Sequence, residues 1–156
     1  MKKSDSDRMR SDRVAKILGS TGTYTRVFGE HPADVRDHLI SVASSLRVGQ
    51  PLAAAFASKD TWTLLTATHL AWREESKTQS LMFSDIKSIR LTQDDMEEIL
   101  REPSRKALVD TLEVVASSGH VYHVSLEGGV PLYRFWRAIR LLAFSNFGRS
   151  PESQVP

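Results

Sequence analysis

The chain has 156 residues, of which 40% are hydrophobic and 26% charged, and its formal net charge is only +2. This composition is typical of one globular domain and argues against wholesale disorder, and the small net charge by itself gives no support for nucleic-acid binding. Because the chain has no cysteine, disulfides, thiolate metal sites and a cysteine nucleophile are excluded.

The first residues predict a protein that stays inside the cell. Lys2 and Lys3 are followed by polar and charged residues at 4–8, where a secretory signal peptide would have an apolar segment. The chain also has no run of about 18 apolar residues, so the sequence predicts no membrane-spanning helix. We therefore expect a cytoplasmic localisation.

Two helices are predicted in residues 1–50, which we interpret as a helical N-terminal extension that packs on the rest of the chain. Residues 6–18 carry a short apolar stripe at helical spacing, and Gly19 is a typical helix end. A second helix is predicted to begin at Pro32 and to end before Gly49. Its apolar face is continuous and consists of Val35, Leu39, Val42, Ala43 and Leu46.

Beyond Pro51 the hydrophobic period shortens to two residues, which is typical of β-strands with one buried face. Seven strands are predicted, at residues 52–58, 61–66, 68–74, 78–83, 87–92, 110–116 and 120–126. Most links between them are hairpin-length, so neighbouring strands are expected to be antiparallel. A single core cluster is expected to contain Trp62, Leu64, Leu70, Trp72, Phe83, Ile89, Leu112, Val114, Val124 and Trp136.

A short helix interrupts the strands, and a long helix follows them. Asp94 is predicted as the N-cap of the short helix, and Pro103 as its end. The side chains of this helix that are expected to face the protein are Met96, Ile99 and Leu100. The long helix begins near residues 130–131, and its apolar stripe contains Leu132, Phe135, Trp136, Ile139, Leu142 and Ala143. Residues 148–156 are polar and are expected to be a disordered tail.

Residues 61–72 resemble the opening strand–turn–strand unit of bacterial pleckstrin-homology-like (PH-like) domains. Residues 81–89 resemble a second recurring part of these domains, in which a strand is followed by a polar residue, Asp and Ile, and then by the next strand. Trp136 lies where the final helix of such domains commonly carries a tryptophan that plugs the barrel. The resemblance covers residues 51–145 and implies an α+β fold, with a PH-like seven-stranded antiparallel barrel or sandwich capped by a C-terminal helix. We assign residues 51–147 to this domain.

The resemblance also bears on phosphoinositide binding. PH domains that bind phosphoinositides carry a lysine at the end of the first strand and an Arg-x-Arg pair on the second. Lys59 can stand in for the lysine, but residues 62–66 on the second strand contain no basic residue. This departure from the family pattern argues against specific phosphoinositide binding.

No catalytic, cofactor or metal site is expected from the residues. His120 and His123 are three residues apart, which on a strand places them on opposite faces. The acidic residues 94–98 lack the spacing of a calcium-binding loop, and no Gly-x-Ser-x-Gly nucleophile motif is present. An enzyme therefore remains an alternative only as a small hydrolase or isomerase whose site is not visible in the sequence.

The final helix carries the candidate binding surface. Residues 128–149 contain four arginines and no acid. A basic row of this kind is either a solvated helix face or a surface that contacts an acidic partner, and mixed arginine and aromatic side chains are typical of interfaces. The candidate residues are Arg134, Arg137, Arg140, Tyr133 and Phe144.

Together these features favour a non-enzymatic protein-interaction module whose partner presents an acidic surface, with self-association as a second mode. No specific nucleic-acid binding is expected. Among binding proteins, the alternative is an immunity or antitoxin protein that neutralises a cognate toxin, since small single-domain proteins without catalytic motifs are typical of that class.

Overall fold

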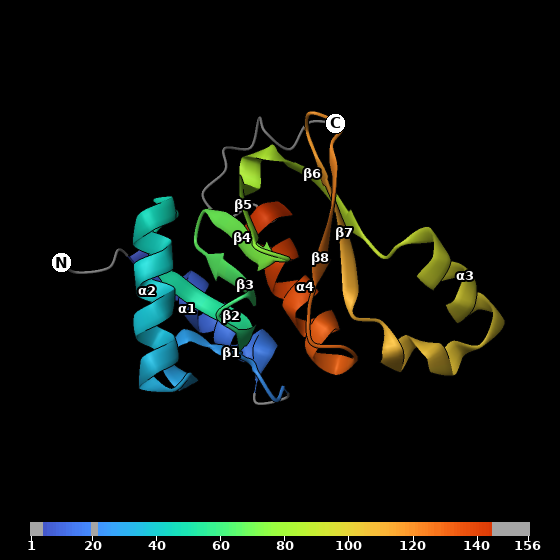
Figure 1. Ribbon diagram of the computed structural model, residues 1–156, viewed down its shortest axis with the longest axis horizontal. Coiled ribbons are helices and arrows are strands. Elements are labelled where there is room, and N and C mark those ends of the chain that lie inside the picture. The colour runs from blue at the N-terminus through green and yellow to red at the C-terminus, as the bar shows by residue number, and fades with distance from the viewer. Residues whose placement is uncertain (1–4, 20–21, 145–156) are drawn as a thin grey trace.

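The computed structural model describes residues 5–19 and 22–144, which fold into two antiparallel β-sheets with helices around and between them (Figure 1). The helices are α1 (Asp5–Leu18), α2 (Ala33–Leu46), α3 (Gln93–Arg101) and α4 (Val130–Phe144). Three short 3-10 helices are η1 (Phe28–Glu30), η2 (Phe83–Asp85) and η3 (Pro103–Leu108). The four helices predicted from the sequence are therefore present, and the predicted tail at 148–156 lies outside the described residues.

The larger sheet has five strands in chain order: β1 (Thr25–Val27), β2 (Pro51–Ser58), β3 (Thr61–Thr66), β4 (His69–Glu74) and β5 (Lys77–Met82). The smaller sheet contains β6 (Ile86–Arg90), β7 (Thr111–Ala116) and β8 (Val121–Ser125). All neighbouring strands pair antiparallel, as expected from the short links. The seven predicted strands are confirmed to within two residues at each end.

Two details of the predicted architecture are corrected. The short strand β1 was not predicted, and it adds to the edge of β2 by pairing Thr25 with Ala55 and Val27 with Ala53. The described strands also do not close into a barrel, because no strand of one sheet pairs with a strand of the other. The sheets touch where Thr63 Oγ1 donates a hydrogen bond to the Ser125 carbonyl at 3.1 Å, and α4 fills the space between them (Figure 1).

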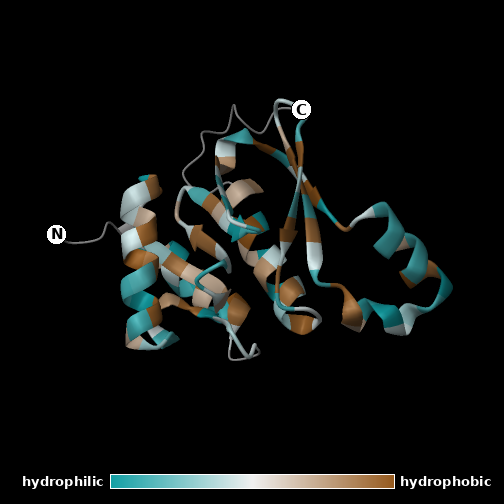
Figure 2. Cartoon of the chain, in the orientation of Figure 1, coloured by the Kyte–Doolittle hydropathy of each residue, from teal (hydrophilic) through white to brown (hydrophobic). Residues whose placement is uncertain are grey.

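The five-stranded sheet is buried on both faces, so the core is divided. Trp62 and Leu64 of β3 pack against the apolar face of α2, which is buried as predicted. Leu65 of β3 points the other way, into a larger cluster with α1, α4 and the three-stranded sheet. Figure 2 shows hydrophobic residues concentrated on the central strands and α4. The prediction of a single core cluster is therefore wrong, because α2 covers the second face of the sheet and creates a separate core.

The helix α4 enters the larger cluster along one side. Leu132, Phe135 and Ile139 are fully buried there, whereas Trp136 is only partly buried at the edge of the cluster. Trp136 was expected to plug a barrel, and this prediction is corrected because the helix turns Phe135, not Trp136, towards the centre. The helix α1 packs on α4, and its Val14 and Leu18 are buried between them and the sheet.

The helix α3 and the following η3 form an arm that projects away from both sheets, at the right of Figure 1. The N-cap of α3 is Thr92, whose Oγ1 accepts a hydrogen bond from Asp95 N at 3.2 Å, and not Asp94 as predicted. A threonine at this position satisfies one of the free N–H groups of the first turn, and acidic residues in that turn favour the helix dipole. The arm therefore has its own helix-forming signals, independent of the sheets.

Candidate functional site

The predicted basic row on α4 divides into two parts. With about 100° of rotation per helical residue, four of the five candidate binding residues share one stripe along α4, and Arg134 lies about a quarter turn away from it. Arg134 is half-buried, and its Nη1 donates to the Leu18 carbonyl of α1 at 3.4 Å, so it joins two helices. The outer stripe of α4 consists of Tyr133, Arg137, Arg140 and Phe144.

The outer stripe is positively charged and partly apolar. Arg137 and Arg140 are exposed, and neither forms an ion pair with another residue in the described part of the chain. Phe144 is 38% exposed. At the start of the stripe, Lys106 Nζ lies 5.4 Å from the Tyr133 ring centroid, and Tyr133 Oη donates to the Lys106 carbonyl at 3.0 Å. These contacts connect the outer stripe to the arm.

The arm carries an apolar surface that the sequence did not predict. Met96 and Leu100 were expected to face the protein, but both are exposed and only Ile99 packs on the core. Leu100 is 79% and Leu108 66% exposed. The signal was present in the sequence as an amphipathic helix, but its apolar side has no covering element among the described residues. The arm surface consists of Met96, Leu100, Leu108 and the neighbouring Val130 of α4.

A hollow joins the arm surface to the outer stripe. It has a volume of about 370 Å³ and lies between η3 and the start of α4. Its walls include Pro103, Ala107 and Tyr133. Burial, and then the nearby Asp95 carboxylate, raise the pKa of Tyr133, which keeps its hydroxyl a neutral hydrogen-bond donor. The hollow therefore connects Val130 of the arm surface to Tyr133 of the outer stripe.

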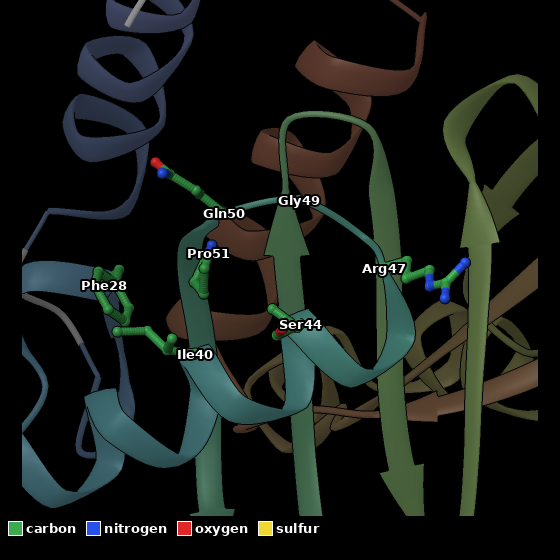
Figure 3. A pocket seen from close by; sticks show the side chains of 8 residues that line it. Phe28, Ile40, Ser44, Arg47, Gly49, Gln50 and Pro51 are labelled. Atoms are coloured by element: carbon green, nitrogen blue, oxygen red, sulfur yellow. The ribbon is translucent and has the colours of Figure 1, made fainter. Parts of the chain in front are cut away.

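Two further hollows flank α2. The first has a volume of about 500 Å³ and an apolar end where Phe28 and Ile40 lie side by side, whereas the Arg47 side chain is directed away from them (Figure 3). The second, of about 460 Å³, lies on the other side of α2, above strands β3–β5, and has a polar lining that includes Lys59 and Arg73.

Three histidines on or near the sheets, His31, His120 and His123, have contacts within the fold. His31 is buried, and its Nε2 lies 2.9 Å from the Ala54 carbonyl, so this nitrogen must carry a proton and donate. His123 Nε2 is 3.3 Å from Glu113 on one face of β8, whereas His120 contacts the Tyr122 ring on the other. The predicted opposite faces are confirmed. Within residues 5–19 and 22–144, no three potential metal-ligating side chains cluster together.

No protein-family model, curated protein or solved structure matches the chain. In the described ranges, no helix is both long enough and apolar enough to cross a membrane. Function is therefore inferred from the geometry and chemistry of the surfaces described above.

Proposed function

We propose that the protein is a non-enzymatic interaction module of PH-like fold that binds an acidic protein surface. Two antiparallel sheets in consecutive strand order, followed by a C-terminal helix whose apolar side enters the core, support the PH-like part of the proposal. The observation that carries the binding part is the outer stripe and the arm surface, which the hollow between Val130 and Tyr133 connects. Together they combine exposed arginines with exposed large apolar side chains.

The chemistry of this face suits a protein partner. Contiguous exposed apolar side chains favour burial by a partner, and arginines beside aromatic rings are typical of interface anchors. The guanidinium group of arginine also donates two parallel hydrogen bonds to one carboxylate, which favours an acidic surface over a neutral one. Because α4 packs in the core along its length, Arg137 and Arg140 project from a rigid element, and binding orders little backbone.

The test is affinity purification from the native cell with wild type and two charge-reversal variants. The Arg137→Glu/Arg140→Glu variant is expected to lose a partner that wild type captures, and cross-links in the wild-type complex should connect α4 to an acidic segment of that partner. The matched control is Lys77→Glu/Lys87→Glu, which makes the same charge change at exposed positions on β5 and β6. The proposal is wrong if the α4 variant remains folded and captures the same partners as wild type.

A further inference from the structure

A row of directly paired side chains crosses the five-stranded sheet on the side that α2 covers. In the strand register, Trp62 of β3 lies opposite Arg73 of β4, and Arg73 lies opposite Thr78 of β5. Directly opposite residues of antiparallel strands place their side chains on the same face, a few ångströms apart. The row therefore begins under α2 at Trp62 and extends beyond the helix at Arg73 and Thr78.

The indole nitrogen of Trp62 has no hydrogen-bond partner. The side chain is only 3% exposed, and its Nε1 is a buried donor that no described residue satisfies. Buried donors are nearly always paired with protein, water or a bound group, so an unpaired one requires an explanation. Trp62 also lines the second hollow beside α2, of about 460 Å³.

The hollow that Trp62 lines also contains charged groups that favour an anion. Lys59 and Arg73 contribute two positive charges, and Asp60, at the exposed tip of the β2–β3 turn, contributes one negative charge. Arg73 Nη1 donates to Thr78 Oγ1 at 2.8 Å, and its Nε is 3.9 Å from Asp60 Oδ1, which leaves Nη2 without a described partner. Opposite these groups, α2 contributes the hydroxyls of Ser41 and Ser45.

We propose that this groove binds a phosphate group, with one oxygen accepting from Trp62 Nε1–H and others contacting Arg73 and Lys59. A tetrahedral oxyanion suits donors that approach from several directions, and arginine and lysine are both common phosphate ligands. Since the Trp62 nitrogen is fully buried, binding requires a rotamer change in a side chain that covers it. The groove and α4 lie on opposite faces of the five-stranded sheet, so this site does not depend on the proposed protein-binding face.

The three indole N–H groups provide a direct test in solution. Inorganic phosphate is titrated into ¹⁵N-labelled protein, and sodium chloride at matched ionic strength serves as the reference. The Trp62 indole signal is expected to shift saturably with phosphate and not with chloride, whereas the signal of Trp72, which faces the other core, stays in place. The site is refuted if the Trp62 indole signal does not shift saturably, or if chloride produces the same shift.

Matched variants then test the roles of the residues. Trp62→Phe removes the donor together with part of the ring system, and it is expected to remain folded while weakening phosphate binding roughly 5- to 10-fold, as read from backbone amide shifts at Thr78. Trp72→Phe makes the same change in the other core and should leave the affinity unchanged. Arg73→Gln is expected to weaken binding and Asp60→Asn to strengthen it. Unchanged affinity in both Trp62→Phe and Arg73→Gln overturns the proposal.

A last experiment distinguishes a small phosphorylated compound from a lipid headgroup as the ligand. The same titration is made with vesicles that contain phosphatidylinositol 4,5-bisphosphate, and with vesicles that contain phosphatidylcholine alone. We expect neither vesicle to bind in a headgroup-selective way at physiological salt, because β3 carries no basic residue and α2 forms one wall of the hollow. Selective binding to the phosphorylated vesicles that Arg73→Gln abolishes would show that the ligand is a lipid headgroup and not a small phosphorylated compound.

Discussion

At the scale of single residues, Glu127 holds the segment before β1 in place. Its carboxylate accepts hydrogen bonds from the backbone N–H groups of Thr23, Tyr24 and Thr25 at 2.6, 2.8 and 2.9 Å. Burial raises the pKa of Glu127, but these bonds outweigh that effect and hold the pKa below its ordinary value. One side chain near α4 thereby fixes a segment about a hundred residues earlier in the chain.

We expect Glu127→Gln to lower the free energy of unfolding by about 1.5–3 kcal/mol at pH 7, because glutamine is uncharged and keeps only one of the two oxygens that accept these hydrogen bonds. Since the folded pKa is below the unfolded one, the contribution is fully present above the unfolded pKa of about 4.3 and is lost as the pH falls through the folded pKa. Urea unfolding at pH 7 and at acidic pH measures both effects. Glu75→Gln, at an exposed turn, should change neither.

His31 is a second residue whose environment predicts a dependence on pH. Burial lowers its pKa, although hydrogen bonds to the carbonyls of Ala54 and Arg26 act in the opposite direction. With a folded pKa below the unfolded value, the unfolded chain takes up the proton first. Stability is therefore expected to fall as the pH drops below about 6.5, down to the folded pKa.

The measurement is the free energy of unfolding in urea between pH 8 and pH 5. His31→Gln removes the titration and should flatten this part of the curve, whereas the exposed His120→Gln should leave the slope as in wild type. An equal slope in wild type and His31→Gln would show that His31 does not stay neutral in the folded protein.

At the scale of elements, α4 is held by Phe135 more than by Trp136. Phe135 is fully buried between the sheets, whereas Trp136 is partly exposed at the edge of the core. We expect Phe135→Ala to cost about 3–5 kcal/mol in urea unfolding, as for a large aromatic side chain removed from a core. Trp136→Ala should cost clearly less, and a larger loss for Trp136→Ala than for Phe135→Ala would contradict this assignment.

The end of α2 provides a second test at this scale. Arg47 caps the helix in the left-handed conformation, with φ 57°, and Val48 N donates to the Ala43 carbonyl at 3.2 Å. Glycine is the residue that usually occupies this position, since a side chain there costs about 1 kcal/mol. We therefore expect Arg47→Gly to stabilise the protein and raise its thermal midpoint. Ser41→Gly, inside the same helix, should destabilise the protein by a similar free energy and lower the midpoint. A lower midpoint for both variants would exclude strain at Arg47.

At the scale of the whole molecule, charge is distributed unevenly despite a net charge of +2. The outer stripe of α4 is basic, while α3 contains Asp94, Asp95, Glu97 and Glu98. Long-range attraction between opposite charges chiefly raises association rates, and buried apolar anchors chiefly lower dissociation rates. The two kinds of residue on the proposed face should therefore be separable by kinetics.

With a partner identified by affinity purification, Arg137→Glu is expected to slow association and weaken its dependence on salt. Phe144→Ala is expected to speed dissociation with little effect on association. Both residues are exposed, so neither variant should shift the thermal midpoint appreciably. Surface-immobilised partner and a series of salt concentrations give the rates, and wild-type kinetics in both variants would exclude this face.

Much of the fold could be predicted because the signals are local. Leu112 and Val114 are two residues apart with Glu113 between them, and this spacing identified β7 as a half-buried strand. Three residues in β1 are too few for such a pattern, and only their pairing with β2 makes them a strand. For the candidate site, the sequence indicated the arginines of α4, but it could not separate Arg134, which bonds to α1, from the exposed Arg137 and Arg140.

The sequence by itself determined the four helices and all the strands except β1, since the spacing of apolar residues sets which face of a helix or strand can be buried. Only the tertiary structure decided which of those faces are covered. The helices α2 and α3 both carry an apolar stripe, yet Leu39 of α2 is fully buried on the sheet while Leu100 of α3 is exposed on the arm. The physical reason is that burial depends on contacts between segments far apart in the chain, which a local pattern does not specify.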